Sequence, residues 1–198
     1  MPIGVDTRKA AVARAAIDAG ASMVNDVSAL QQDAELARVA ADSGVAVCLM
    51  HMRGVPETMQ QEARYADVIE EVIGFLSAAL ERAMAAGIAR ERVVVDPGIG
   101  FGKTFAHNHF LLRRLGDLRV LGRPVLVGFS RKGFLGALTG GKPAPQRVLA
   151  TAACAAAVAM NGGADFLRVH DAAEVREALA VAQAIRAAQD GGELFVAR

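Results

Sequence analysis

The stretch Val93–Lys103, VVVDPGIGFGK, decides the fold, because an apolar run ends in a carboxylate that a glycine-rich loop follows. A continuous run of β-branched residues is typical of a strand buried on both faces, as in parallel sheets that helices cover. Asp96 then lies at the carboxyl end of this strand, where open α/β sheets and (β/α) barrels bind their ligands. Taken alone, the Asp-Pro-Gly tripeptide fits a carboxylate that caps a turn just as well.

The same arrangement recurs along the chain, since five further apolar runs are each followed at once by polar residues. These runs are Gly4–Thr7, Ser22–Ala29, Val45–Met52, Pro124–Lys132 and Asp165–Asp171. The segments between them have helical character: Arg8–Gly20, Asp33–Gly44, Tyr65–Gly87, His109–Leu121, Arg147–Gly162 and Glu174–Ala188. This alternation predicts an α/β fold with a single parallel sheet, either doubly wound or closed as a barrel. Polar groups after nearly every strand favour the barrel, because an open sheet concentrates its ligands at one switch point.

The length of the chain predicts one domain over residues 1–198. A (β/α)8 barrel usually has roughly 250 residues, so the sequence predicts an incomplete barrel with about six βα units. The Gly- and Pro-rich stretch Thr139–Pro145 is predicted to be a mobile loop. Residues 191–198 are predicted to be a flexible tail.

Composition indicates a cytoplasmic enzyme. No apolar run reaches the ~18 residues that a membrane span needs, and the first ten residues contain no apolar signal segment. The net charge is +1, with both signs interspersed, and Trp is absent, so neither a nucleic acid nor a membrane is expected as a partner. Cys48 and Cys154 are expected to be small buried hydrophobic residues, not a disulfide or a metal site.

Six motifs together resemble dihydropteroate synthase, in the order and near the spacing of that family. They are VDTRK at 5–9, VNDVS at 24–28, CLMHMRG at 48–54, DPGIGFGK at 96–103, VGFSRK at 127–132 and RVHD at 168–171. The match covers essentially the whole chain and corresponds to strands 3 to 8 of the family's TIM-type barrel. The resemblance implies the condensation of 6-hydroxymethyl-7,8-dihydropterin pyrophosphate with para-aminobenzoate, a homodimer, and a target of sulfonamides.

The resemblance also assigns roles to side chains of both charges. Asp96 would accept two adjacent hydrogen bonds from the amino-pyrimidine edge of the pterin, while Asn25 and Asp6 would bind neighbouring ring atoms. Lys132 would lie near the pterin carbonyl and the aminobenzoate, and Arg168 and His170 would stabilise the departing pyrophosphate. The remaining residues expected to bind substrate are Met50, Phe101, Gly128, Ser130 and Val169.

Simpler interpretations exist for each of these residues. Asn25 with Asp26 fits turn chemistry, and we expect Asp26 to be structural. Asp6 with Thr7 fits a helix N-cap, and Met50 fits a core position. Lys132 beside Arg131 fits a solvated basic pair.

Simpler interpretations also exist for the histidines and for the motif RVHD at 168–171. Arg168 and His170 beside Asp171 fit a salt-bridge cluster. His51 fits a strand-end histidine that the backbone satisfies, and His107 and His109 are expected in a loop and at a helix start.

The chain departs from the family pattern at its beginning. The first two βα units are not in the sequence, and with them the asparagine loop that the family uses to bind Mg²⁺, so Mg²⁺ is expected from the family without its protein ligand here. The first and last strands would be unpaired edges, which tend to associate with other chains. Two alternatives to the synthase therefore remain: a noncatalytic pterin-binding fragment, and a methyltetrahydrofolate-binding methyltransferase barrel. The SRK and RVH segments favour the synthase, because methyl transfer has no pyrophosphate to neutralise.

Overall fold

The computed structural model describes residues 1–54, 59 and 63–189. It contains six strands: β1 (Gly4–Asp6), β2 (Met23–Asp26), β3 (Ala46–Met50), β4 (Val93–Asp96), β5 (Leu126–Val127) and β6 (Phe166–Leu167). The α-helices are α1 (Ala10–Asp18), α2 (Ala34–Ser43), α3 (Val68–Ala85), α4 (Phe105–Arg113), α5 (Gly133–Leu138), α6 (Val148–Asn161) and α7 (Ala172–Gln189). The described residues also contain three 3₁₀ segments: η1 (Arg90–Arg92), η2 (Leu115–Leu121) and η3 (Ala144–Gln146).

All six strands are parallel and follow one another in sequence order. β1 to β4 form one sheet, and β5 pairs with β6 in a second. A bridge between Val95 and Val125 joins the two, supported by a hydrogen bond from the Val95 amide to the Pro124 carbonyl at 3.0 Å. The predicted parallel α/β architecture is therefore confirmed, but the single sheet is not, because the strands form a four-stranded and a two-stranded section that one bridge links. Within the described ranges, β1 and β6 each pair with one strand only.

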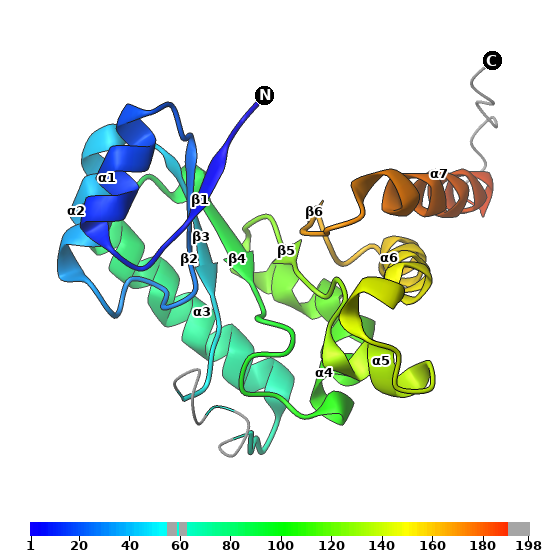
Figure 1. Cartoon of the computed structure of the whole chain (residues 1–198). Helices are drawn as coiled ribbons and strands as arrows, with labels where there is room; N and C mark the ends of the chain where they lie inside the picture. Colours follow the sequence, from blue (N-terminus) through cyan, green and yellow to red (C-terminus); the bar gives the residue numbers. More distant parts are fainter. Residues whose placement is uncertain (55–58, 60–62, 190–198) are drawn as a thin grey trace.

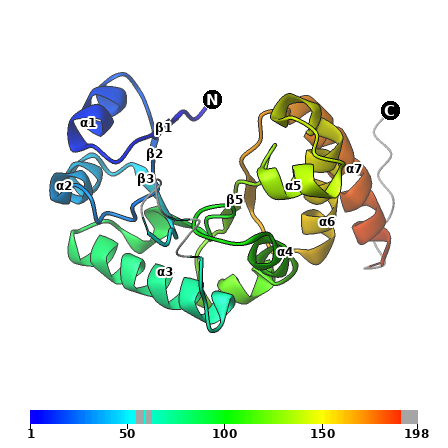
Figure 2. The same cartoon turned by 60° about the horizontal axis from the view of Figure 1, so that its bottom comes forward.

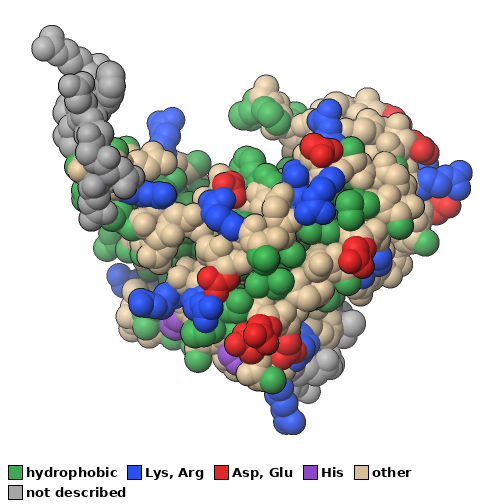
Figure 3. Space-filling model, turned by 180° about the vertical axis from the view of Figure 1, so that it is seen from behind, with side chains coloured by type: hydrophobic (Ala, Val, Ile, Leu, Met, Phe, Trp, Pro, Cys, Tyr) green, Lys and Arg blue, Asp and Glu red, His purple; other side chains and the backbone are tan. Residues whose placement is uncertain are grey.

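The two faces of the strand array have different surroundings. In β4, Val93 and Val95 belong to the hydrophobic core, while Val94 and Asp96 point to the other face, because successive side chains of a strand alternate. The helices lie along the outer, convex side of the array (Figure 1, Figure 2). Seen from behind, the molecule is hollowed between its N-terminal and C-terminal helices, and charges of both signs are scattered over this surface (Figure 3). The core thus occupies one face and leaves the other for a site.

Side-chain caps set several helix boundaries. Asp33 accepts a hydrogen bond from the Glu35 amide at the start of α2, and Gly44 ends that helix in the left-handed conformation. Asp67 accepts from the amides of Ile69 and Glu70 and begins α3. Both helices lie inside the segments predicted from the sequence.

Other predicted boundaries were wrong. Helix α4 begins at Phe105, not at His109, because the Thr104 and His107 side chains form a capping box. His107 and His109 are therefore both helical. The helix ends at Arg113 and continues as η2 instead of as one segment to Leu121. Neither Asp6 nor Thr7 is the N-cap of α1, which is Lys9 with no side-chain cap bond.

Two further expectations concern segments near the C-terminal half. The short helix α5 was not predicted, and the stretch expected as a mobile loop, Thr139–Pro145, ends inside η3. The predicted flexible tail, 191–198, lies outside the described residues.

No helix in the described part of the chain combines the length and apolarity needed to cross a membrane.

Asp26 stabilises the turn after β2. Its buried carboxylate accepts hydrogen bonds from the Ser28 amide at 2.8 Å, the Ser28 hydroxyl at 2.6 Å and the Leu30 amide at 2.7 Å. These bonds hold Ala29 and Leu30 at positive φ, a conformation that residues with a side chain rarely adopt. Asp26 is structural, as expected.

We predict that Asp26→Ala lowers the free energy of unfolding by about 2–3 kcal/mol, because it leaves buried donors without an acceptor. Urea denaturation followed by circular dichroism measures the change. Asp42→Ala, at an exposed position of α2, is the control and should change stability by no more than about 0.5 kcal/mol. Equal stabilities of the two variants would contradict the role given to Asp26.

Candidate functional site

Asp6 and Asn25 form a polar pair at the carboxyl ends of β1 and β2. The two residues are register partners in the sheet, and Asn25 Nδ2 donates to Asp6 Oδ1 at 2.7 Å. This bond fixes the orientation of the Asn25 amide. Asn25 Oδ1 is buried and has no hydrogen-bond partner among the described residues. A buried, oriented acceptor without a donor is the kind of group that a ligand satisfies.

Asp96 is the buried carboxylate of the site. Its side chain is 1% exposed; Oδ1 accepts from the Gly98 amide at 2.8 Å and Oδ2 accepts from Arg168 Nη2 at 3.0 Å. Burial raises the pKa of Asp96, although Arg168 beside it and the Gly98 amide act in the opposite direction. Each carboxylate oxygen has two lone pairs, so both can accept a further hydrogen bond from a ligand.

The glycine loop after β4 packs directly against the residues that follow β3. Gly98 has φ +67°, and a Cβ there would lie 1.8 Å from the His51 carbonyl oxygen. Only glycine fits this contact. This close approach fixes the direction of the Gly98 amide. Because that amide donates to Asp96 Oδ1, it also fixes the orientation of the Asp96 carboxylate.

Lys132 reaches back to this loop. Its Nζ donates to the Ile99 carbonyl and lies 4.5 Å from the centre of the Phe101 ring. Burial lowers the pKa of Lys132 to about 8, against the opposite effect of Asp96. The interpretation of Lys132 as a solvated surface lysine is therefore wrong, because its ammonium is bound inside the site.

The segments after β5 and β6 meet above the array. Gly128 leaves the space that Arg168 occupies: a Cβ at this glycine would lie 2.9 Å from the guanidinium. Ser130 Oγ is 2.9 Å from His170 Nδ1 and also accepts from the His170 amide at 3.2 Å. These contacts connect the motifs VGFSRK and RVHD, which carry the three side chains expected to act on the pyrophosphate and the aminobenzoate.

Asp171 has a different partner from the one expected. Arg131 binds it through Nε at 2.9 Å and through Nη2, whereas Arg168 is paired with Asp96. The simpler interpretation, in which Arg168 and His170 form a salt-bridge cluster with Asp171, is therefore wrong for Arg168. Arg131 has φ +59°, and this conformation turns its side chain toward Asp171 while Lys132 points into the site.

The structure brings most of the predicted site residues to one edge of the array. Asp96, Arg168, Lys132 and Phe101 are linked by contacts, and Met50, which is fully buried, is the register partner of Asp96. Ser130 and His170 form a second group, and Asp6 and Asn25 form a third at the neighbouring strands.

Val169 does not belong with these polar residues. Its side chain packs against the hydrophobic core, because it alternates with Arg168 and His170. The Val169 side chain is therefore not part of the polar cluster, and the binding of substrate by Val169 stays a prediction.

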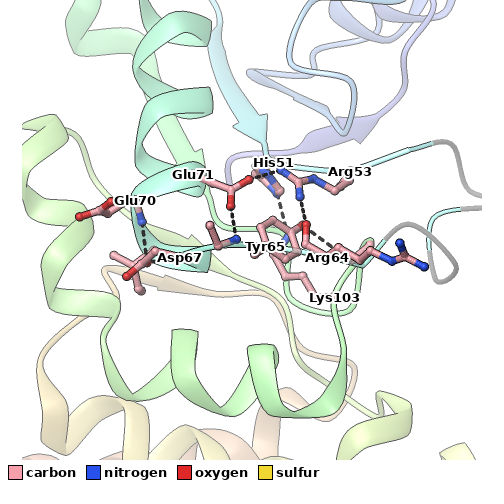
Figure 4. A network of polar contacts seen from close by, with 11 residues as sticks. His51, Arg53, Arg64, Tyr65, Asp67, Glu70, Glu71 and Lys103 are labelled. Carbon is pink, nitrogen blue, oxygen red and sulfur yellow. Dashed lines mark hydrogen bonds and ion pairs between the residues drawn. The ribbon is translucent and has the colours of Figure 1, made fainter.

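Sequence reasoning missed the pair of Lys103 and His51. Lys103, the last residue of the opening stretch, is 1% exposed, and its Nζ lies 2.8 Å from His51 Nδ1. The His51 ring contacts the Lys103 ammonium in addition to a backbone hydrogen bond, so the backbone contact expected from the sequence is present and the lysine is the partner that it did not predict. Figure 4 shows both side chains beside Arg53 and Tyr65. The sequence contains one indication of this pair, because Lys103 directly follows the glycine loop that packs against the residues after β3.

The described residues offer no ready metal site. Over the described ranges, no group of three or more His, Cys, Asp or Glu side chains is placed to hold a metal ion. Part of the segment after β3, 55–58 and 60–62, including portions of the motif with Pro56 and Thr58, lies outside the described residues.

Comparisons with known proteins agree on one family. The model of the pterin binding enzyme family matches residues 1–170. The chain is 45% identical over 186 residues to a dihydropteroate synthase of Synechocystis, an alignment that covers 93% of this chain and 64% of that protein. The chain therefore spans about two thirds of the length of this relative.

Solved structures give the same result. The fold matches the dihydropteroate synthase of Yersinia pestis in complex with a sulfonamide drug, with a TM-score of 0.90, 42% identity, and coverage of 94% of this chain and 67% of that one. It matches the Xanthomonas albilineans enzyme in complex with 7,8-dihydropteroate with a TM-score of 0.86, 45% identity, and coverage of 94% and 68%.

We predict that the fold loses stability as the pH falls from about 6.5 toward 3, in part because of His51. Burial, followed by the charges of Lys103 and Arg53, lowers the pKa of His51 to about 3. Between this value and the ordinary value near 6.5, the unfolded chain binds a proton that the folded chain does not, so acid favours unfolding by up to about 1.4 kcal/mol per pH unit.

Thermal denaturation of the chain and of His51→Asn at pH 7, 5 and 4 measures this effect. The variant keeps a hydrogen-bonding group near the Nδ1 position but cannot be protonated, so its stability should fall less steeply with pH. His109→Asn replaces an exposed histidine of α4 and serves as the control. If the melting temperatures of all three proteins depend on pH in the same way, protonation of His51 does not contribute to the loss of stability in acid.

Proposed function

The chain belongs to the pterin-binding enzyme family, and we propose that it is the greater part of a dihydropteroate synthase. In this reaction, 6-hydroxymethyl-7,8-dihydropterin pyrophosphate condenses with para-aminobenzoate to give 7,8-dihydropteroate and pyrophosphate. The observation that carries the proposal is the buried Asp96 carboxylate, with lone pairs still available, at the same edge of the array as the unpaired Asn25 oxygen.

Recognition of the pterin follows from hydrogen-bonding capacity. The amino-pyrimidine edge presents neighbouring N–H donors, which the two oxygens of Asp96 can accept side by side. Asn25 Oδ1 supplies another acceptor, oriented by its bond to Asp6. A ring with a different edge would leave these buried groups unpaired, and this penalty gives selectivity.

The cationic side chains suit the departing pyrophosphate. When the bond between the pterin methylene carbon and the pyrophosphate oxygen breaks, negative charge develops on the leaving group and positive charge on the methylene. Arg168, His170 and Lys132 would stabilise the former, and the carboxylates of Asp6 and Asp96 would stabilise the latter. The amine of para-aminobenzoate then forms the new C–N bond and releases a proton.

The aminobenzoate would lie near Phe101 and Lys132. The Phe101 ring offers an apolar surface, and Lys132 Nζ above it offers a positive charge close to that surface. Catalysis in this arrangement is mainly electrostatic and positional. Met50, Gly128 and Ser130 complete the substrate-binding set that we propose.

Mg²⁺ is part of the family expectation, but we derive no step through it. The side chains described here do not form a cluster that would hold the ion. A requirement for Mg²⁺ therefore stays a prediction.

The wider assembly is also part of the proposal. The sequential parallel array with helices on its convex side fits strands 3 to 8 of a TIM-type barrel. A homodimer and a cytoplasmic location remain proposals from the family resemblance.

Two other functions compete with this one. A noncatalytic pterin-binding fragment would keep Asp96 and Asn25 but lack turnover. A methyltetrahydrofolate-binding methyltransferase would also use a carboxylate and an amide for the pterin. The placement of Arg168 and Lys132 around Asp96 favours the synthase over the methyltransferase, since a methyl donor has no pyrophosphate to stabilise.

We predict that Asp96→Asn weakens the binding of 6-hydroxymethylpterin about 10- to 100-fold, because an amide accepts on one side only and loses the charge. Titration of the pterin fluorescence with protein measures the affinity. Asp18→Asn, at an exposed position of α1, is the matched control and should bind like the unchanged chain. Equal affinity of Asp96→Asn and Asp18→Asn would contradict the proposed pterin site.

Formation of 7,8-dihydropteroate, measured with and without added Mg²⁺, separates the synthase from the noncatalytic fragment. We predict weak pterin binding and slow or no turnover, because the chain spans only about two thirds of the length of its relatives. Full activity comparable to that of the relatives would contradict this prediction. Within this predicted range, slow condensation would support the synthase, whereas pterin binding without any condensation would favour the noncatalytic alternative.

A further inference from the structure

Lys103 is a buried ammonium whose three donors are all used. Its Nζ lies 3.0 Å from the Gly98 carbonyl oxygen, 3.0 Å from the Phe101 carbonyl oxygen and 2.8 Å from His51 Nδ1. An ammonium has three N–H groups and no acceptor, so this geometry satisfies it fully. Lysine is almost never fully buried without such partners. Lys103 is therefore built into the structure and is not an accidental surface group.

The bonds of Lys103 join the two halves of the glycine loop. Gly98 and Phe101 lie on either side of the loop turn, and the Phe101 amide donates to the Gly98 carbonyl at 3.0 Å. The same two residues supply the groups that act on the proposed ligands: the Gly98 amide binds Asp96, and the Phe101 ring lies beneath Lys132. A side chain that holds these carbonyls in place therefore holds the site in place.

The acceptor for the third bond is itself fixed. The ring of His51 packs edge-on against Phe75 at 4.8 Å and lies 6.1 Å from the ring of Tyr65. Its low pKa keeps it neutral at ordinary pH, so Nδ1 is available to accept from Lys103. With Lys103 as the donor, the ring proton of His51 is assigned to Nε2.

A second group of contacts supports the loop from the side of α3. Tyr65 Oη donates to the Gly102 carbonyl at 2.8 Å, and the Arg53 guanidinium lies 4.0 Å above the Tyr65 ring (Figure 4). Arg53 also binds the Arg64 carbonyl and the Glu71 carboxylate. A Cβ at Gly102 would lie 2.4 Å from the Arg53 carbonyl oxygen, so the loop and the residues after β3 are packed without a gap. These contacts give Lys103 and His51 a rigid base.

We propose that Lys103, held by His51, is a positioning residue for the substrate site: by binding the carbonyls of Gly98 and Phe101, it sets the geometry of the Asp96 carboxylate and of the Phe101 ring. This inference rests on the proposed function for its effect on ligand binding. Its effect on the loop can be tested without any ligand. Lys103 does not touch the substrate in this scheme and is not a catalytic residue.

The first test compares loop protection in Lys103→Met and Lys142→Met. Methionine approximates the length of lysine without the donors, and Lys142 lies at an exposed position before η3. Hydrogen exchange of the Gly98 and Phe101 amides, measured by NMR, should become at least 10-fold faster in Lys103→Met and stay unchanged in Lys142→Met. Equal protection in the two variants would overturn the inference, whatever the chain binds.

The second test separates positioning from a general structural role. Titration with 6-hydroxymethylpterin at 20 °C, where both proteins are folded, should show an affinity at least 10-fold lower for Lys103→Met. Its melting temperature should also fall, because the substitution leaves the Gly98 and Phe101 carbonyls and His51 Nδ1 without their donor. A lower melting temperature with unchanged affinity would indicate a purely structural residue and overturn the inference.

Variants of His51 provide the conservative rescue. His51→Asn keeps a side-chain acceptor near the Nδ1 position and should retain pterin affinity within about threefold, whereas His51→Leu should lose affinity as Lys103→Met does. Equal loss in both His51 variants would contradict the role of the third bond. If the unchanged chain does not bind the pterin, the proposed function fails, and the exchange measurement alone decides whether Lys103 positions the loop.

Discussion

The burial of one carboxylate constrains the rest of this site. Asp96 lies at the end of a strand whose neighbours exclude water, so its charge must be balanced by groups of the protein. Arg168 does so by direct contact, the Gly98 amide by a hydrogen bond, and Lys132 and Lys103 by their charges at longer range. Each of these groups comes from the carboxyl end of β4 or β6 or from the loops after β4 and β5. The curvature of the parallel array is what brings them around a single point.

Burial shifts the pKa values of both the acidic and the basic side chains of this site toward their neutral forms. Burial raises the pKa of Asp96 and lowers the pKa of Lys132 to about 8 and of Lys103 to about 7. The carboxylate and the lysines oppose this effect in one another, because each stabilises the charged form of its neighbour. A ligand that binds Asp96 therefore changes the electrostatic surroundings of both lysines. In the proposed reaction, recognition of the ring and stabilisation of the leaving group would be coupled through this shared charge balance.

The sequence was sufficient to predict the strands and the residues at their ends, because both follow from local pattern. The apolar run of β4 and the glycines after it indicate a buried strand and a tight loop without any knowledge of distant residues. Pairing was not predictable in the same way. Arg168 binds Asp96, which is 72 positions away in the sequence, and Arg131 binds Asp171, which is 40 positions away. No local pattern indicates which arginine pairs with which carboxylate.

Burial of a cation was the second feature hidden in the sequence. Lysine is mostly found on protein surfaces, so the sequence does not predict that Lys103, at the end of the stretch Val93–Lys103, is buried. The start of α4 at Phe105 was obscured similarly, since the capping box uses a histidine in place of the usual Glu or Gln.

The two faces of the strands have separate roles, and this separation shows which contacts of the candidate site depend only on the described strands. Val93, Val95, Val125 and their neighbours on the convex face pack against helices, and this core forms from the residues present here. Asp96, Met50 and Asn25 project from the other face, where their positions depend on the register of adjacent strands and on the loops that follow them. Closing the array is not needed to place Asp96 beside Arg168, Lys132 and the glycine loop, because local packing already places them. The contacts around Asp96 therefore belong to the part of the fold that β3 to β6 build, and any further strands would add groups to this site without having to create it.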